Sequence, residues 1–147
     1  MPRRWLHTAL ALLAIIPAMQ AQSIQNSSRS TIGYIEADGR IQNSSRSTVG
    51  YIDGSGSDAR IQNSSRSTIG YISGSGSSST VQDGSRSTMG YVERNGDEWR
   101  VQNSSRSTIG YISRDGRVAD SSRSTIGYAE GVPAAWAAVH FFFFRFP

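Results

Sequence analysis

Hydrophobic and polar positions follow one pattern six times between residues 24 and 131. Each copy starts with an aliphatic residue, continues through a polar run of the type Gln-Asn-Ser-Ser-Arg-Ser-Thr, and ends in an aliphatic residue, a glycine and a tyrosine. The first aliphatic residue always lies ten positions before the tyrosine, as Ile24 does before Tyr34, whereas the segments between copies vary in length. A fixed motif joined by variable connectors is typical of a repeat architecture.

Each copy of the motif predicts a β-hairpin. In the first copy, residues 24–25 predict a short strand, residues 26–30 a polar bend and residues 31–36 a longer strand. Asn and Ser favour the bend because their side chains bond to nearby backbone groups, and β-branched and aromatic residues favour the strand that follows. Six such hairpins predict an all-β fold made of tandem hairpin repeats.

Side chains alternate along the longer strand, so that Ile32 and Tyr34 should share one face and Gly33 and Ile35 the other. Both faces carry apolar groups, and we therefore expect both to be covered. Glycine inside a strand weakens it, so its place in all six copies indicates a close approach by another backbone or an aromatic ring, with six β-bulges as the alternative. The predicted core is the triplet that ends each copy: Ile32, Gly33 and Tyr34; Val49, Gly50 and Tyr51; Ile69, Gly70 and Tyr71; Met89, Gly90 and Tyr91; Ile109, Gly110 and Tyr111; and Ile126, Gly127 and Tyr128.

The chain divides into three segments. Residues 1–21 have the anatomy of a signal peptide, with Arg3 and Arg4 followed by an apolar run and a small residue at Ala21. Cleavage there would start the mature chain at Gln22, whereas a retained N-terminal anchor is the alternative. Residues 22–131 hold the six-copy β-hairpin repeat domain, and residues 132–147 form an Ala/Phe-rich C-terminal segment. We expect an exported protein that is periplasmic, attached to the cell envelope or secreted.

The C-terminal segment predicts a short helix followed by an apolar tail. Pro133 suits the first turn of a helix, and the alanine-rich stretch after it has high helix propensity. The expected packing residues are Trp136, Phe141, Phe142, Phe143 and Phe144. Such a tail avoids water, so we expect it to fill the interior of the repeat, to form the seam of a homo-oligomer, or to make a peripheral membrane contact.

Composition narrows the chemistry that the chain can support. It has 26 Ser and 15 Gly, and it lacks Cys and Lys, so all 15 of its basic side chains are Arg. Without Cys there are no disulfides or thiolates. Beyond residue 21, 13 Arg face 11 acids. This small excess is spread around the repeat and indicates a solvated surface rather than a partner for nucleic acid, which needs a clustered basic face.

The sequence predicts no catalytic arrangement. His140 is the only histidine beyond residue 21, and it lies in the Phe-rich tail, where a packed or tail-surface histidine is expected. The acids lie in or beside the connectors and differ between copies, which favours turn chemistry over a carboxylate pair. Asp53 and Asp58 lack the ligand spacing of a calcium loop. We expect no catalytic residue, metal site or cofactor, and hence no enzyme.

Six equivalent arginines are the distinctive polar array. Guanidinium groups bind sulfate, phosphate and carboxylate with two parallel hydrogen bonds, and Ser and Thr flank each one, so the array would suit an anionic cell-envelope glycan. The structural alternative is that each arginine closes its own bend by donating to backbone carbonyls or a nearby carboxylate. Both interpretations concern the same residues: Arg29, Arg46, Arg66, Arg86, Arg106 and Arg123.

The repeated motif, the leader and the Phe141 to Phe144 run together resemble the bacterial β-flower proteins, in the 4-fold and 5-fold β-flower families. The resemblance covers nearly the whole chain after the leader. It implies a petal-like array of β-hairpins in an exported protein, and it supplies no catalytic residues because the family has no established biochemical role. We therefore expect a non-enzymatic protein with a structural or self-assembly role in the cell envelope, with an anion- or glycan-binding module as the alternative.

Overall fold

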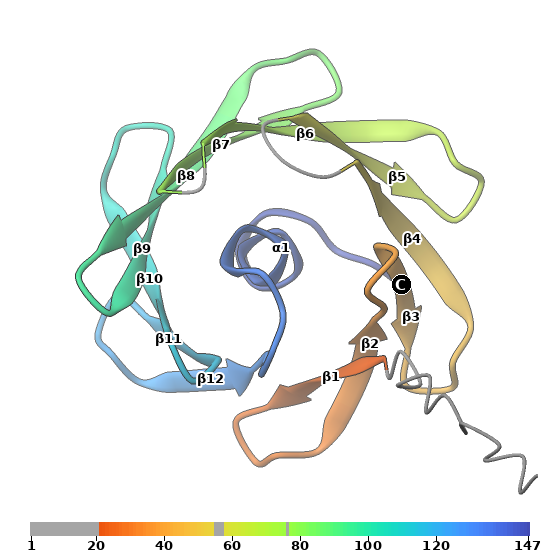
Figure 1. Ribbon diagram of the computed structural model, residues 1–147, viewed down its shortest axis with the longest axis horizontal. Helices are drawn as coiled ribbons and strands as arrows, with labels where there is room; N and C mark the ends of the chain where they lie inside the picture. The colour runs from red at the N-terminus through yellow and green to blue at the C-terminus, as the bar shows by residue number, and fades with distance from the viewer. Residues whose placement is uncertain (1–20, 55–57, 76) are drawn as a thin grey trace, which may run out of the picture.

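Twelve β-strands close into a single antiparallel ring in the computed structural model, which describes residues 21–54, 58–75 and 77–147. The predicted leader lies almost entirely outside the described residues. Figure 1 shows the ring from above, with the C-terminal segment at its centre. The strands are β1 (Gln22–Asn26), β2 (Thr31–Ile35), β3 (Arg40–Asn43), β4 (Thr48–Asp53), β5 (Asp58–Asn63), β6 (Thr68–Ser75), β7 (Ser78–Asp83), β8 (Thr88–Asn95), β9 (Glu98–Asn103), β10 (Thr108–Ser113), β11 (Arg117–Asp120) and β12 (Thr125–Tyr128).

Each sequence repeat forms one hairpin, as predicted, and we call the six hairpins petals 1 to 6: β1–β2, β3–β4, β5–β6, β7–β8, β9–β10 and β11–β12. Consecutive petals also pair with one another, so every strand has two neighbours. The ring closes without a covalent link where β1 pairs with β12, through Gln25 opposite Tyr128 and Asn26 opposite Gly127. The equivalent register recurs between β2 and β3, where Tyr34 lies opposite Gln42 and Gly33 opposite Asn43.

A β-bulge in each petal changes the alternation that the sequence predicts. In petal 1, Ile24 pairs with Gly33 and Gln25 with Thr31, which leaves Ile32 as the extra residue. Gly33 and Ile35 are buried on the inner face and Tyr34 is half-buried on the outer face. The bulged residue therefore does not share the outer face with the tyrosine. In petal 2, for example, the bulged Val49 is buried in the core. The prediction of one strict alternation was therefore wrong at this position, while the alternative of six bulges is confirmed.

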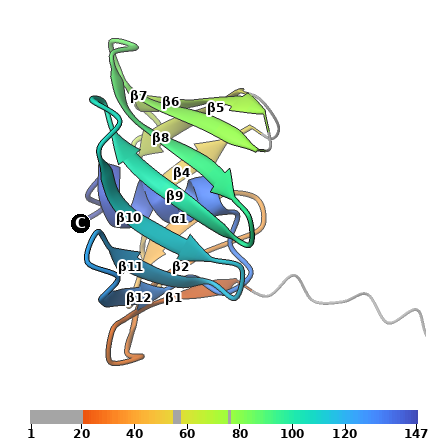
Figure 2. The same ribbon diagram turned by 90° about the vertical axis from the view of Figure 1, so that its left-hand side faces the viewer.

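The C-terminal segment fills the ring. Helix α1 (Ala134–Ala138) and the π-helical turn η1 (Val139–Phe143) run through the centre, and the C-terminus emerges at the end where the hairpin tips lie (Figure 2). Ala137, Ala138 and Val139 are fully buried against the aliphatic residues of the inner wall. Of the three sites expected for this tail, the interior is the one that the structure shows. Among the described residues, no helix is long and apolar enough to cross a membrane.

Five phenylalanine rings each lie against one glycine of the inner wall. A Cβ atom added to any of these glycines would lie closer than 3.0 Å to the ring, so only glycine admits it. Each of the same glycines also faces a main-chain carbonyl oxygen of the adjacent petal. The predicted close approach to both a backbone and an aromatic ring is therefore confirmed for petals 2 to 6. The pairs are Gly127 with Phe141, Gly110 with Phe142, Gly90 with Phe143, Gly70 with Phe144, and Gly50 with Phe146.

The shape of η1 explains how consecutive residues reach consecutive petals. An α-helix turns about 100° per residue, whereas six petals in a ring are about 60° apart. The amide of Phe144 donates to the carbonyl of Val139, five residues back, and this wider turn rotates less per residue. The chain is extended at Phe144, so Arg145 is passed over and Phe146 reaches petal 2.

Petal 1 is the exception. The nearest atoms to a Cβ added at Gly33 are main-chain atoms of Gln42 and Asn43, and no ring is among them. His140 takes this sector instead, because its ring contacts both Phe141 of the petal 6 sector and Phe146 of the petal 2 sector, with centroids 5.4 and 6.1 Å apart. Ile32 of petal 1, at 41% exposure, is correspondingly the exposed large hydrophobic residue of the described chain.

Candidate functional site

The bend at each hairpin tip is closed by its own first residue. The Asn26 side-chain oxygen accepts hydrogen bonds from the amides of Ser28 and Ser30, both at 3.0 Å, and the amide of Arg29 donates to the Asn26 carbonyl. Petals 4 and 6 use Asp83 and Asp120 in the same way. The structural alternative expected the arginine side chain to close the bend by donating to carbonyls or a nearby carboxylate; the Asn or Asp oxygen closes the bend instead, whereas donation to a carboxylate occurs at Arg29, Arg106 and Arg123.

Each arginine of the bends adopts a left-handed backbone conformation, with φ between 62° and 65°. This region is unfavourable for a residue with a Cβ atom, by about 1–2 kcal/mol. The conformation directs the side chain along the outer wall, where the guanidinium stacks on the tyrosine of the preceding petal. The Cζ atom lies 3.7–3.9 Å from the ring centroid in all six pairs: Arg29 on Tyr128, Arg46 on Tyr34, Arg66 on Tyr51, Arg86 on Tyr71, Arg106 on Tyr91 and Arg123 on Tyr111.

These stacks give the outer wall its cover. The sequence pattern, with apolar groups on both faces of the strand, predicts a covering layer on each side, but no second layer of secondary structure lies outside the described ring. The tyrosine rings are covered by guanidinium groups instead. A cation over an aromatic face contributes about 0.5–1 kcal/mol at an exposed site. The Arg29–Tyr128 stack spans the junction without a covalent link, so it helps to close the ring.

Three of the six arginines also bind a carboxylate. Arg29 pairs with Glu130 at 2.9 Å, Arg106 with Glu93 at 2.6 Å, and Arg123 with Glu98 at 2.8 Å. The hydrogen bond that each guanidinium donates to its carboxylate is the main cause that raises the pKa of these guanidinium groups. Hydrogen bonding from the Arg123 guanidinium likewise lowers the pKa of Glu98. These three arginines belong to petals 1, 5 and 6.

Arg46, Arg66 and Arg86 have no carboxylate partner among the described residues. The acid two places after the stacked tyrosine is bound to another arginine at Tyr34 and Tyr51, and it is replaced at Tyr71. Arg40 binds Glu36 through two nitrogens, at 2.7 and 3.1 Å, and Arg60 binds Asp53 at 2.9 Å. The residue two places after Tyr71 is Ser73. The unpaired arginines therefore lie on the consecutive petals 2, 3 and 4, and all three are exposed.

A buried glutamine supports the arginine backbone in three petals. Gln42, Gln62 and Gln102 are each 6% exposed, and each donates from its side-chain nitrogen to the carbonyl of the bend arginine at 3.1–3.2 Å. Their side-chain oxygens have no hydrogen-bond partner among the described residues. In petal 6, Ala119 replaces the glutamine, and Arg117 donates to the Arg123 carbonyl at 3.0 Å instead. Sequence reasoning missed this role, although glutamine follows the first aliphatic residue in five copies.

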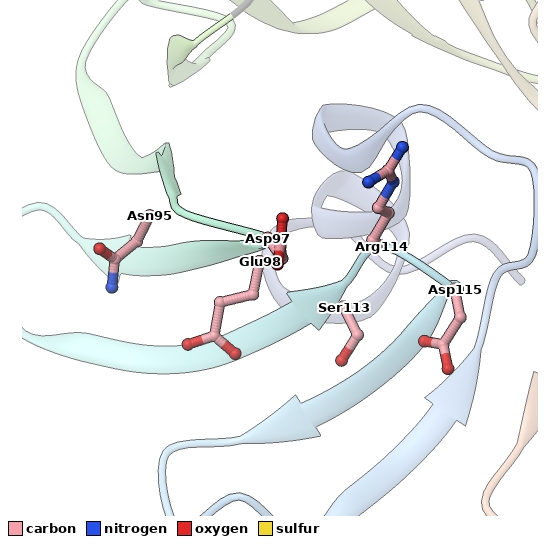
Figure 3. A pocket seen from close by; sticks show the side chains of 6 residues that line it. All are labelled: Asn95, Asp97, Glu98, Ser113, Arg114 and Asp115. Carbon is pink, nitrogen blue, oxygen red and sulfur yellow. The ribbon is translucent and has the colours of Figure 1, made fainter.

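The acids of the connectors do not converge on a common point. Figure 3 shows the residues that line the depression at the β8–β9 and β10–β11 connectors: Asp97 and Glu98 come from the first connector and Asp115 from the second, and Glu98 is bound to Arg123. No group of three or more potential metal ligands occurs among the described residues. His140 lies in the tail, where burial lowers its pKa, and its Nδ1 atom has no hydrogen-bond partner.

A closed ring of β-hairpins, held by stacks between petals and filled by its own C-terminal tail, defines a petal-like repeat protein. Residues 21–145 match the family described as 5-fold beta-flower protein, and the chain belongs to that family. Its ring nevertheless has six petals. The resemblance and the fold class expected from the sequence are thus confirmed.

Two further comparisons add little. No curated protein matches the chain. An X-ray structure of a protein from Arabidopsis thaliana is similar over 82% of this chain and 87% of that chain, with 12% identity and a TM-score of 0.35. A likeness at this score supports no conclusion about either fold or function.

Proposed function

We propose that the protein is exported and serves as a non-enzymatic structural element of the cell envelope. The observation that carries this proposal is the closure of the ring by the same arginine–tyrosine stack at all six junctions, including the one without a covalent link. The repeated side chains of the motif thus build the architecture itself. A rigid closed ring suits a protein whose role is to hold a shape.

Export is tested by expressing the full chain in a bacterial host, fractionating the cells and measuring the mass of the product. We expect the envelope fraction to contain a chain that begins at Gln22. Replacing Leu12 and Leu13 by Arg breaks the apolar run of the leader and should leave the whole chain in the cytoplasm. Finding the unchanged sequence in the cytoplasm at full mass would contradict the export part of the proposal.

Self-assembly is proposed at the end of the ring where the tail emerges. His140, Phe144, Arg145, Phe146 and Pro147 line an apolar depression there. Two copies meeting at this end would cover it, and an anionic membrane surface is the competing partner. Arg145→Glu adds an acid to the exposed rim without removing a ring. We expect it to weaken association in sedimentation velocity at several concentrations, whereas a loss of vesicle binding with unchanged association would favour the membrane.

The second candidate function is the binding of an anionic glycan on the outer wall. The exposed guanidinium groups of Arg46, Arg66 and Arg86, which lack a carboxylate partner among the described residues, favour it. A purified protein that retains no acidic polysaccharide on an affinity gel would remove this candidate and leave the structural role in place.

A further inference from the structure

The six arginines of the outer wall are equivalent in sequence but not in the structure. Glu130, Glu93 and Glu98 neutralise those of petals 1, 5 and 6. Those of petals 2, 3 and 4 keep their guanidinium nitrogens available. Any anion that binds the outer wall should therefore meet one side of the ring, which is a distinction that six identical motifs do not predict.

The unpaired guanidinium groups are held in place before a ligand arrives. Arg46 and Arg66 are fixed at the backbone by the bend, where Gln42 and Gln62 support their carbonyls. One face of each guanidinium lies on a tyrosine ring, at 3.8 and 3.9 Å. The planar edge remains free to bind a carboxylate or sulfate with two parallel hydrogen bonds. Binding then loses little side-chain freedom, which favours affinity.

Acidic neighbours restrict the site further. Arg86 lines a depression that also contains Asp53, Asp58 and Arg60, and Asp83 lies in its own bend. The bends of petals 2 and 3 begin with the neutral Asn43 and Asn63. Arg46 and Arg66 are therefore the two unpaired arginines whose own bends carry no acid, whereas Arg86 lies beside acids.

The surroundings favour a polysaccharide over a nucleic acid. Proteins that bind single-stranded nucleic acid offer aromatic faces on which bases stack. Here the outer faces of Tyr34 and Tyr51 are already covered by guanidinium groups. The exposed serines beside the arginines can bond to sugar hydroxyl groups instead, and these are Ser44, Ser45, Ser47, Ser64, Ser65 and Ser67.

We propose that petals 2 and 3 form a binding site for a linear acidic polysaccharide, in which Arg46 and Arg66 each bind a carboxylate or sulfate group of the chain. This inference rests on the second candidate function above and assigns that function to one side of the ring. Petals 5 and 6 carry the same motif but do not bind, because their arginines are occupied by Glu93 and Glu98.

The test compares two double variants of the mature chain that lose the same charge. Arg46→Gln with Arg66→Gln removes the site, and Arg106→Gln with Arg123→Gln removes two stacks of the same kind elsewhere. Affinity electrophoresis is run in polygalacturonate, heparin and neutral dextran. We expect the first variant to lose affinity about tenfold or more for a charged polymer and the second to lose about twofold or less. Polygalacturonate and heparin separate a carboxylate ligand from a sulfate ligand.

Three outcomes would overturn the inference in different ways. Equal losses in both double variants would show that binding follows overall charge, so the site would be wrong while glycan binding survives. No retention of the unchanged protein by either charged polymer would remove the binding function itself. Stronger binding of a single-stranded oligonucleotide than of either polysaccharide would overturn the ligand class.

A third double variant guards against misfolding. Arg46→Lys with Arg66→Lys keeps the charge but removes the planar fork of donors. We expect an affinity between those of the unchanged protein and the Gln variant. Thermal unfolding of all three variants identifies any that do not fold, and full affinity of a folded Lys variant would contradict paired hydrogen bonding by the guanidinium groups.

Discussion

The inner and outer walls of the ring come from the same six repeats, yet different interactions stabilise them. On the inner wall, glycines admit phenylalanine rings from the tail and aliphatic residues such as Ile24 and Ile61 are fully buried. On the outer wall, tyrosines are half-exposed and are covered by arginines; the side chains of Arg29, Arg106 and Arg123 are themselves more than half exposed.

This difference separates stability from surface chemistry. Burying apolar surface contributes about 1.5–3 kcal/mol for each large side chain, whereas exposed ion pairs contribute about 0–1 kcal/mol. The inner wall should therefore determine whether the ring folds. Charges on the outer wall can differ between petals with little change in the free energy of unfolding. Three paired and three unpaired arginines are compatible with the same fold for this reason.

The largest effect is expected when a ring is removed from the inner wall. Phe142→Ala deletes the ring that lies against Gly110 and leaves a cavity in the centre. We expect the free energy of unfolding to fall by about 3 kcal/mol. Phe142→Leu is the control and should lose about 1 kcal/mol because it refills most of the volume. Urea unfolding followed by tryptophan fluorescence measures both, and equal losses would show that the ring is not packed there.

A second effect separates the ring contact from the backbone contact at the glycines. A Cβ atom at Gly50 would lie 2.7 Å from Phe146 and 2.8 Å from the Gln62 carbonyl oxygen. A Cβ atom at Gly33 would have one contact under 3.0 Å, with the Gln42 carbonyl oxygen at 2.6 Å. We expect Gly50→Ala to be more destabilising than Gly33→Ala by about 1–3 kcal/mol.

Phe146→Ala provides the control for this pair, since it removes the ring while keeping the backbone contact. Combined with Gly50→Ala, it should restore part of the lost stability in a double-mutant cycle. Combined with Gly33→Ala, it should show simple additivity. Coupling of the same size at both glycines would contradict the assignment of Phe146 to petal 2.

The sequence predicted the inner wall better than the outer one. Periodicity and turn chemistry are local, and they indicated the hairpins, the bends at residues 26–30 and the need for a close approach at Gly33 and its equivalents. Which carboxylate pairs with a bend arginine depends on how the petals meet around the ring. Arg29 and Glu130 are 101 residues apart, and no spacing in the motif indicates their contact.

The path of the C-terminal tail could not be predicted from the sequence either. Four consecutive phenylalanines suggested a packed segment, but their order around the ring depends on the π-helical turn, which no local preference announces. The repeated glycine indicated either a bulge or a close approach, and the motif does not indicate that both occur together. Homo-oligomer formation, membrane contact and export stay predictions, because each depends on a partner or a process outside the folded chain.

A smaller effect is expected from the backbone of the outer wall. Arg66 has φ of 62° and stacks on Tyr51. Arg66→Ala loses the stack and keeps the unfavourable conformation, whereas Arg66→Gly loses the stack and relieves that conformation. We expect the Gly variant to be more stable than the Ala variant by about 1 kcal/mol in thermal unfolding. The opposite order would indicate that the backbone of the bend relaxes once the side chain is gone.

The smallest effect concerns the one sector of the inner wall without a phenylalanine. Burial lowers the pKa of His140, and no charged group contributes to that shift; Arg145 is the charged residue that shares its depression. Below the ordinary histidine pKa of about 6.5 the unfolded chain takes up a proton that the folded chain resists. Stability from this group is therefore present above that pH and is lost as the pH falls towards the lowered value.

His140→Phe should remove this part of the pH dependence and place a sixth ring in the petal 1 sector. The measurement is urea unfolding of both proteins between pH 7.5 and about 5.5, a range in which ordinary carboxylates change their protonation little. We expect the two stability curves to converge towards neutral pH and to separate as the pH falls, with the Phe variant the more stable. Parallel curves would mean that His140 is accessible to protons in the folded ring, and that the petal 1 sector is open to solvent.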